Sequence, residues 1–164
     1  MNSKQKSILI AIDGSPAARA AVAVGLEVAM AMQASVSFVH ASPLARELFE
    51  LYPMDGPPVD KILEWDEVLR DAIEQARKES VDAEPRLLVR EGHSADVAVD
   101  IAGMAEGLEA SMIIVGSRGR GLVAGEVLGS VSHNLIKWAT VPILIVHAPE
   151  KVAPGLSGEE QDGN

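Results

Sequence analysis

Short runs of aliphatic and β-branched residues alternate along the chain with longer segments whose apolar residues recur at helical spacing. Three of the short runs are almost wholly apolar, which is typical of strands buried on both faces of a parallel sheet. The predicted strands are Ser7–Ile12, Ser35–Ala41, Arg86–Arg90, Ser111–Val115 and Val141–His147.

The segments between these strands predict helices. Ser15 is a good N-cap and Pro16 suits the first helical position, whereas Ser94 is expected to cap a later helix. The predicted helices are Pro16–Met32, Val59–Ser80, Ala95–Leu108 and Ser130–Thr140. This alternation predicts the α/β class, as a doubly wound, five-stranded parallel sheet with right-handed crossovers and helices on both faces.

The length of 164 residues suits one domain, which we expect over residues 1–148. Residues 42–58 contain four prolines and no regular pattern. We expect a mobile or functional loop there, with a tolerated surface insertion as the alternative. Residues 149–164 are rich in proline, glycine and acidic residues, which predicts a disordered acidic tail.

The formal net charge of -10, without any cluster of lysine or arginine, argues against binding to DNA or RNA. The absence of cysteine excludes disulfides and thiolate metal sites, and it fits a reducing compartment. The apolar run Ile8–Ile12 near the N-terminus is too short for a signal peptide or a membrane span. We therefore expect a cytoplasmic protein that does not bind membranes.

A glycine segment, defined here as residues 116–132, links the fourth predicted strand to the last predicted helix. It contains five glycines from Gly116 to Gly129, and glycine lets backbone N–H groups approach a ligand closely. The helix that follows begins with unpaired N–H groups at the positive end of its dipole. Ser130 and Ser132 add hydroxyl groups there, so the segment is typical of a phosphate-binding site.

Two better-known phosphate-binding motifs do not fit this segment. A P-loop requires Lys-Ser/Thr after its second glycine, but Leu122 and Val123 follow Gly121. A dinucleotide-binding fingerprint lies after the first strand and has an acidic residue about 20 positions later. The corresponding window here, residues 141–144, contains no carboxylate, so we exclude both motifs.

The spacing that does fit is Gly116-x2-Gly119-x9-Gly129-Ser130, and through it the sequence resembles the universal stress protein family, in its ATP-binding type. The resemblance covers roughly residues 5–148. Its other parts are the preceding strand Met112–Val115, the closing Val-Pro-Ile-Leu-Ile-Val strand, Ile8-Leu-Ile-Ala-Ile-Asp13-Gly-Ser15 and Ser37-Phe-Val-His40-Ala41.

This resemblance implies an ATP-binding, homodimeric stress-response protein with an adenine-nucleotide α-hydrolase-like fold and with Mg²⁺ or Mn²⁺ on the phosphates. Asp13 and the backbone at Ala41 would hold the adenosine, and the glycine segment would hold the ribose and phosphates. The implied nucleotide-binding residues are Asp13, Ala41, Val115, Gly116, Arg118, Gly119, Gly129, Ser130, Val131 and Ser132. Pairing between two copies is expected along Val141–His147, predicted as an apolar edge strand.

The topology of such a sheet supports the same site. With the strand order 3-2-1-4-5, the crossovers from strands one and four go to opposite faces, and ligands bind at the carboxyl ends of strands at such a point. Asp13 ends strand one and Gly116 ends strand four. The two halves of the site should therefore converge.

Several of these side chains have a second interpretation. Asp13 could cap the first helix or its turn, and Arg118 and Arg120 could be solvated loop residues rather than phosphate clamps. His40 is expected to be a structural histidine at the end of a buried strand, and His133 a partly exposed helix residue.

The sequence favours a binding or sensing role over efficient catalysis. No base lies beside the glycine segment and no phosphate-reaching lysine is present, so any ATP hydrolysis should be slow. One alternative is a nucleotide-independent, homodimeric interaction module, against which the complete glycine segment counts. The other is an enzyme of the wider α-hydrolase-like fold, for which the turn at residues 13–16 is too short to carry the usual phosphate-binding motif.

Overall fold

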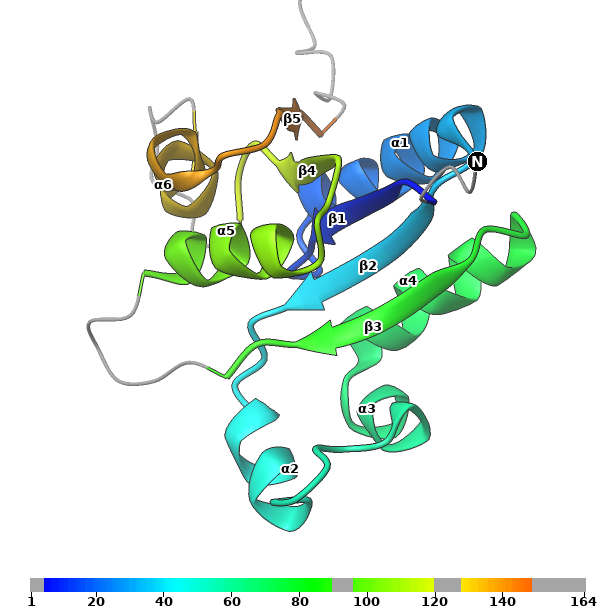
Figure 1. Ribbon diagram of the computed structural model, residues 1–164, viewed down its shortest axis with the longest axis vertical. Coiled ribbons are helices and arrows are strands. Elements are labelled where there is room, and N and C mark those ends of the chain that lie inside the picture. Colours follow the sequence, from blue (N-terminus) through cyan, green and yellow to red (C-terminus); the bar gives the residue numbers. More distant parts are fainter. Residues whose placement is uncertain (1–4, 90–95, 120–127, 149–164) are drawn as a thin grey trace, which may run out of the picture.

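The computed structural model describes residues 5–89, 96–119 and 128–148. Five parallel strands form one sheet in the order β3-β2-β1-β4-β5 (Figure 1). The strands are β1 (Ser7–Ala11), β2 (Ser35–His40), β3 (Ala83–Leu87), β4 (Met112–Gly116) and β5 (Ile143–Val146). The predicted fold class and strand order are confirmed.

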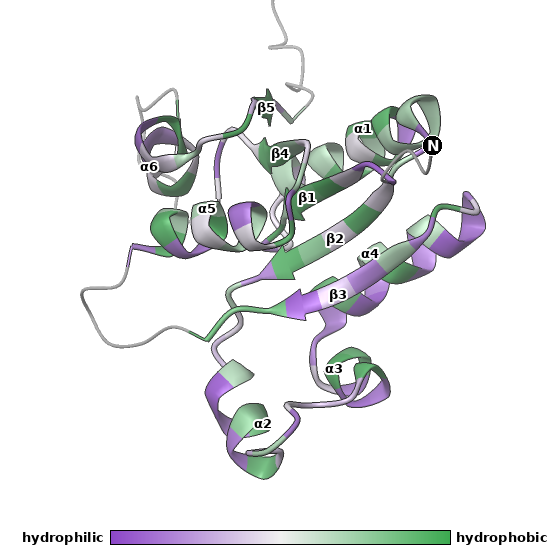
Figure 2. Ribbon diagram, viewed as in Figure 1, coloured by the Kyte–Doolittle hydropathy of each residue, from purple (hydrophilic) through white to green (hydrophobic). Residues whose placement is uncertain are grey.

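Helices cover both faces of this sheet (Figure 1). They are α1 (Pro16–Met32), α2 (Ala45–Leu51), α3 (Val59–Trp65), α4 (Glu67–Lys78), α5 (Val97–Gly107) and α6 (Ser130–Trp138). The alternation of side chains along β1 divides the core: Ile8 and Ile10 pack with α1 and α4, whereas Leu9 and Ala11 pack with α5 and α6. Figure 2 shows hydrophobic residues along β1 and β4 and hydrophilic residues on the edge strand β3.

Helix α1 passes very close to the carboxyl end of β4. A methyl group added to Gly116 would lie 2.7 Å from the backbone carbonyl carbon of Ala17 and 2.8 Å from the amide nitrogen of Ala18. Only glycine fits there without moving the helix. The contact places the first turn of α1 beside the end of β4.

Strand β3 begins three residues earlier than the sequence predicts, at Ala83 rather than Arg86. It pairs in parallel with β2, with Ala83 opposite Val36 and Leu87 opposite His40. The strand includes Pro85, which has no N–H to donate and therefore argues against a central strand. An edge strand tolerates it, and β3 lies at the edge of the sheet.

The prediction of one continuous helix over residues 59–80 is wrong, because α3 and α4 are separated at Asp66. The backbone of Asp66 is extended, with φ -118° and ψ 100°, and its carboxylate accepts a hydrogen bond from the Leu69 N–H at 2.9 Å. Such a cap starts a new helix. The apolar pattern continues across the break, so it gave no sign of it.

Residues 42–58 are not irregular throughout, because α2 lies within them and buries Ala45 and Leu48. The fifth helix starts at Val97 and is capped by the Asp96 carboxylate, so the expected start at Ala95 is wrong. Its expected cap at residue 94 and the predicted tail at 149–164 lie outside the described residues. Within the described ranges, no helix has the length and apolar character needed to span a membrane.

Candidate functional site

A pocket of about 280 Å³ lies at the carboxyl ends of β1, β2 and β4, facing the first turn of α6. The structure brings all of the implied site residues together around it: Asp13, Ala41, Val115, Gly116, Arg118, Gly119, Gly129, Ser130, Val131 and Ser132. This convergence is what the strand order leads one to expect. Their contacts with a ligand stay a prediction.

One wall of the pocket is apolar, and sequence reasoning missed it. It includes Val97 and Ile101 on α5 and Val39 on β2. Val97 and Ile101 have the i, i+4 spacing of one helix face, but in a sequence this spacing indicates only packing against a core. An apolar wall opposite a polar one suits a ligand that has both a ring system and a charged group.

The polar wall is the first turn of α6. The first N–H that bonds within this helix is that of His133, which donates to the Gly129 carbonyl at 2.9 Å. The N–H groups of Ser130, Val131 and Ser132 come before it, and no described side chain caps them. The N-termini of α1, α4 and α5 are each capped by a side chain. Among the described residues the amides of the first turn of α6 have no partner, so the start of this helix combines them with a positive dipole end, a combination that binds anions.

The two serines of this turn play different parts. Ser130 is exposed, whereas Ser132 is 2% exposed and its hydroxyl lies 3.1 Å from the Ser117 carbonyl oxygen and 3.0 Å from that of Gly129. The Ser117 carbonyl also accepts the Gly129 N–H at 2.7 Å. The Ser132 hydroxyl thus holds the two ends of the glycine segment together, and Ser130 is the freer hydroxyl for a ligand.

Across the pocket, the carboxylate of Asp13 lies between the turn after β1 and the glycine segment. Its Oδ1 accepts the Ser15 N–H at 2.9 Å, which stabilises the turn before α1. A methyl group added to Gly119 would lie 2.8 Å from Oδ2. The helix itself is capped by Ser15, so Asp13 stabilises the turn while its carboxylate also borders the pocket.

Of three other side chains that the sequence pointed to, the structure describes two. Arg118 lines the pocket and is exposed, and His133 is exposed on α6 as expected. Arg120 lies outside the described residues. Among the residues described, no group of three His, Asp or Glu side chains could hold a metal ion. A divalent cation here would be held mainly by the ligand's own oxygens and by water, as Mg²⁺ often is in nucleotide sites.

The carboxyl end of β2, which borders the pocket, is fixed by a buried contact between His40 and Asp66, the N-cap of α4. Nδ1 of His40 lies 2.8 Å from Oδ2 of Asp66, and both residues are buried. Burial alone would raise the pKa of Asp66, but hydrogen bonds from His40 and the Leu69 N–H, the charge of His40 and the Ser42 hydroxyl hold it below its usual value. The expectation of a structural histidine at position 40 is confirmed.

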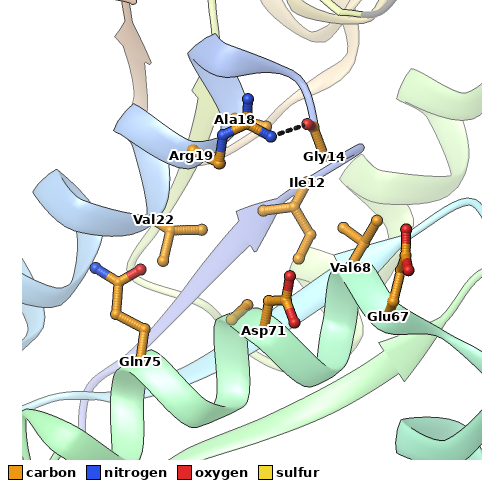
Figure 3. A pocket seen from close by; sticks show the side chains of 10 residues that line it. Ile12, Gly14, Ala18, Arg19, Val22, Glu67, Val68, Asp71 and Gln75 are labelled. Atoms are coloured by element: carbon orange, nitrogen blue, oxygen red, sulfur yellow. Dashed lines mark hydrogen bonds between the residues drawn. The ribbon is translucent and has the colours of Figure 1, made fainter.

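A second pocket, of about 240 Å³, lies between α1 and α4 (Figure 3). The carboxylates of Glu67 and Asp71 rise from α4 toward it, and the guanidinium of Arg19 donates to the Gly14 carbonyl at 2.6 Å. The N-terminus of α4 is already capped by Asp66. This pocket offers an anion two repelling carboxylates and no free helix end, so a phosphate fits the first pocket better.

Comparisons with known proteins agree with this geometry. A model of the universal stress protein family matches residues 5–147. A universal stress protein of Mycobacterium tuberculosis is 30% identical over 158 residues, which are 92% of this chain and 51% of the relative. One from Thermus aquaticus is 33% identical over 149 residues, 86% of this chain and 98% of the relative. The chain spans about half the length of the mycobacterial relatives that it matches.

Solved structures give the same result. A universal stress protein from Archaeoglobus fulgidus in complex with dAMP is 25% identical, with a TM-score of 0.60, and the match covers 86% of this chain and 97% of that one. A universal stress protein in complex with cAMP is 26% identical, with a TM-score of 0.60 and coverage of 90% and 100%. The family match and these relatives show that the chain belongs to the universal stress protein family.

Proposed function

We propose that this chain binds ATP in the pocket between β1, β4 and α6 and acts as a nucleotide-dependent stress-response protein. The observation that carries the proposal is the uncapped first turn of α6, whose amides at Ser130, Val131 and Ser132 border the pocket. Three adjacent N–H groups at a helix start are suited to a phosphate group. They act at short range, so the net negative charge of the chain does not prevent binding.

The other end of the pocket suits an adenine ring. Ala41 and Val39 of the β2 end, with Val97 and Ile101 of α5, give it an apolar lining. Asp13 lies near the middle, where a carboxylate could accept hydrogen bonds from a nucleoside. Two structural relatives of about this size were solved in complex with adenine nucleotides, dAMP in one and cAMP in the other.

The chemistry of the pocket favours binding over turnover. Its described titratable lining residues are Asp13, His40 and Arg118, and the two that could act as a base already have partners: the Ser15 N–H for Asp13 and the Asp66 carboxylate for His40. Phosphoryl transfer needs a positioned base and cationic clamps on the terminal phosphate. We expect ATP hydrolysis to be slow at most, with Mg²⁺ or Mn²⁺ bound through the phosphates.

We also propose that two copies of the chain pair along β5. This strand is at the edge of the sheet, and all of its residues, Ile143–Val146, are aliphatic and only partly buried. An edge of this kind leaves backbone N–H and C=O groups available for a second strand.

Calorimetry with ATP and Mg²⁺ tests the nucleotide site, with Gly119→Ala as the informative variant. The added methyl group would displace the Asp13 carboxylate from its place 2.8 Å away, and no other described residue lies within 4 Å of it apart from its chain neighbours. We expect the variant to stay folded and to lose roughly tenfold or more in affinity for ATP, about 1.4 kcal/mol. GTP and AMP, titrated alongside, report the contributions of the base and of the outer phosphates.

Gly103→Ala is the matched control, because a methyl group there would have no atom of another described side chain or segment within 4 Å. It should bind ATP as the unmodified protein does. If the unmodified protein gives no heat with ATP and either cation, the chain is better described as a nucleotide-independent interaction module.

A further inference from the structure

The hydroxyl of Ser15 makes two contacts of different kinds. It accepts a hydrogen bond from the Ala18 N–H at 3.1 Å, which caps α1. It also donates to the carbonyl oxygen of Arg118 at 3.2 Å, a residue 103 positions away in the sequence. Ser15 is 3% exposed, so water does not compete freely for either bond. The bond accepted from Ala18 therefore stabilises α1, and the bond donated to Arg118 links α1 to the glycine segment.

The backbone of Ser15 adds a third contact that bears on the same pocket. Its N–H donates to Oδ1 of Asp13 at 2.9 Å, while Oδ2 of Asp13 faces the position that a side chain on Gly119 would occupy. The turn after β1 and the chain after β4 thus approach each other at neighbouring points. At one point the Ser15 hydroxyl contacts the Arg118 carbonyl directly. At the other, Ser15 acts through Asp13, whose carboxylate lies beside Gly119.

We propose that Ser15 is a positioning residue for the nucleotide pocket: its hydroxyl links the two halves of the site and sets the distance between Asp13 and the Arg118-Gly119 backbone. This inference rests on the proposed function of the pocket. Sequence patterns assign Ser15 only the helix cap, because they show the local acceptor and not the distant donor bond. The bond that the Ser15 hydroxyl donates to Arg118 is the one that the proposed link between the two halves of the pocket requires.

Three substitutions separate the two contacts of this hydroxyl. Ser15→Thr keeps the donor and the acceptor. Ser15→Asp keeps an acceptor for the Ala18 N–H but, when ionised, has no hydrogen to give the Arg118 carbonyl. Ser15→Ala loses both. The probe is adenosine, which is uncharged, so the new carboxylate of Ser15→Asp does not repel it as it would repel ATP.

Calorimetry with adenosine and thermal unfolding should be measured on the full chain. We expect Ser15→Thr to bind within about twofold of the unmodified protein, and Ser15→Asp and Ser15→Ala to bind roughly three- to tenfold more weakly, the loss typical of one hydrogen bond. Ser15→Asp should recover the thermal stability that Ser15→Ala loses, since aspartate is a good N-cap. The amide resonance of Gly119 in the ligand-free protein should shift in Ser15→Asp and not in Ser15→Thr.

Two results would overturn the inference while leaving the proposed function intact. One is adenosine binding by Ser15→Ala that equals that of the unmodified protein, because the donor bond would then be dispensable. The other is an unshifted Gly119 resonance in Ser15→Asp, because the link would then not position the segment. If the unmodified protein binds neither ATP nor adenosine, the proposed function fails and the inference fails with it.

Discussion

At the residue scale, two positions without a side chain shape the surroundings of the pocket. The missing side chain of Gly119 leaves room for the Asp13 carboxylate, and the missing side chain of Gly116 lets α1 lie against β4. The two glycines have different reasons for being glycine: the first borders a functional group, whereas the second permits helix packing. Both lie in the glycine segment, so its spacing reflects helix packing at Gly116 and the shape of the pocket at Gly119.

At the residue scale, the pair of His40 and Asp66 gives a prediction about pH. The pKa of Asp66 is held below its usual 3.8, so the carboxylate stabilises the fold above that pH, and the contribution is lost as the pH falls through the lower, folded-state pKa. Asp66→Asn keeps an oxygen for the Leu69 N–H but removes the charge. We expect a lower free energy of unfolding for this variant at pH 7, with the difference from the unmodified protein narrowing below pH 3.8.

Urea denaturation at several pH values measures this difference. The control is Asp71→Asn on the same helix, whose side chain is 77% exposed and should matter little at any pH. A difference for Asp66→Asn that stays constant from neutral to acid pH would show that the charge is not what stabilises the junction of α3 and α4.

The side chains around the pocket also show where sequence reasoning stops at this scale. The sequence identifies Ser130 and Ser132 as hydroxyl groups at a helix start, but not that Ser132 is buried against the Ser117 carbonyl. It identifies Ser15 as a cap, but not its bond to Arg118. Both hydrogen bonds are made to residues that are distant in the sequence, and local sequence patterns do not reveal such partners.

At the scale of elements, hydrophobic periodicity predicted most of the strands and helices because it reflects burial on the faces of the sheet. It missed α2, whose seven residues bury only Ala45 and Leu48 among neighbouring prolines. It also missed the break at Asp66, because the apolar face runs on from Ile62 to Leu69 and the cap depends on one carboxylate. Short helices and polar breaks carry too few apolar positions to be read from a pattern.

The edge strand β5 gives the prediction that belongs to this scale. If two copies pair along β5, Ile145→Lys should leave the fold intact and convert a dimer into a monomer, because an edge lysine opposes strand pairing. Sedimentation velocity at micromolar concentration measures the change. Ile136→Lys is the control, since Ile136 lies on α6 and is 57% exposed. A monomeric unmodified protein, or a variant that stays dimeric, would contradict pairing along β5.

At the scale of the whole molecule, the order of the strands explains why the site is where it is. The strand order β3-β2-β1-β4-β5 makes β1 and β4 neighbours, and their carboxyl ends bring together Asp13, Gly116 and the start of α6. This convergence could be predicted from the sequence, since it depends only on the topology. The apolar wall from α5 could not, because it depends on how the helix packs.

The most direct test follows the backbone amides of isotope-labelled protein by NMR as ATP and Mg²⁺ are added. The account predicts that the largest changes fall on the amides of Ser130, Val131, Ser132 and Gly119, because these N–H groups border the phosphate end of the pocket. Changes confined to the second pocket, at Asp71 and Gln75, or no change at saturating nucleotide, would contradict it.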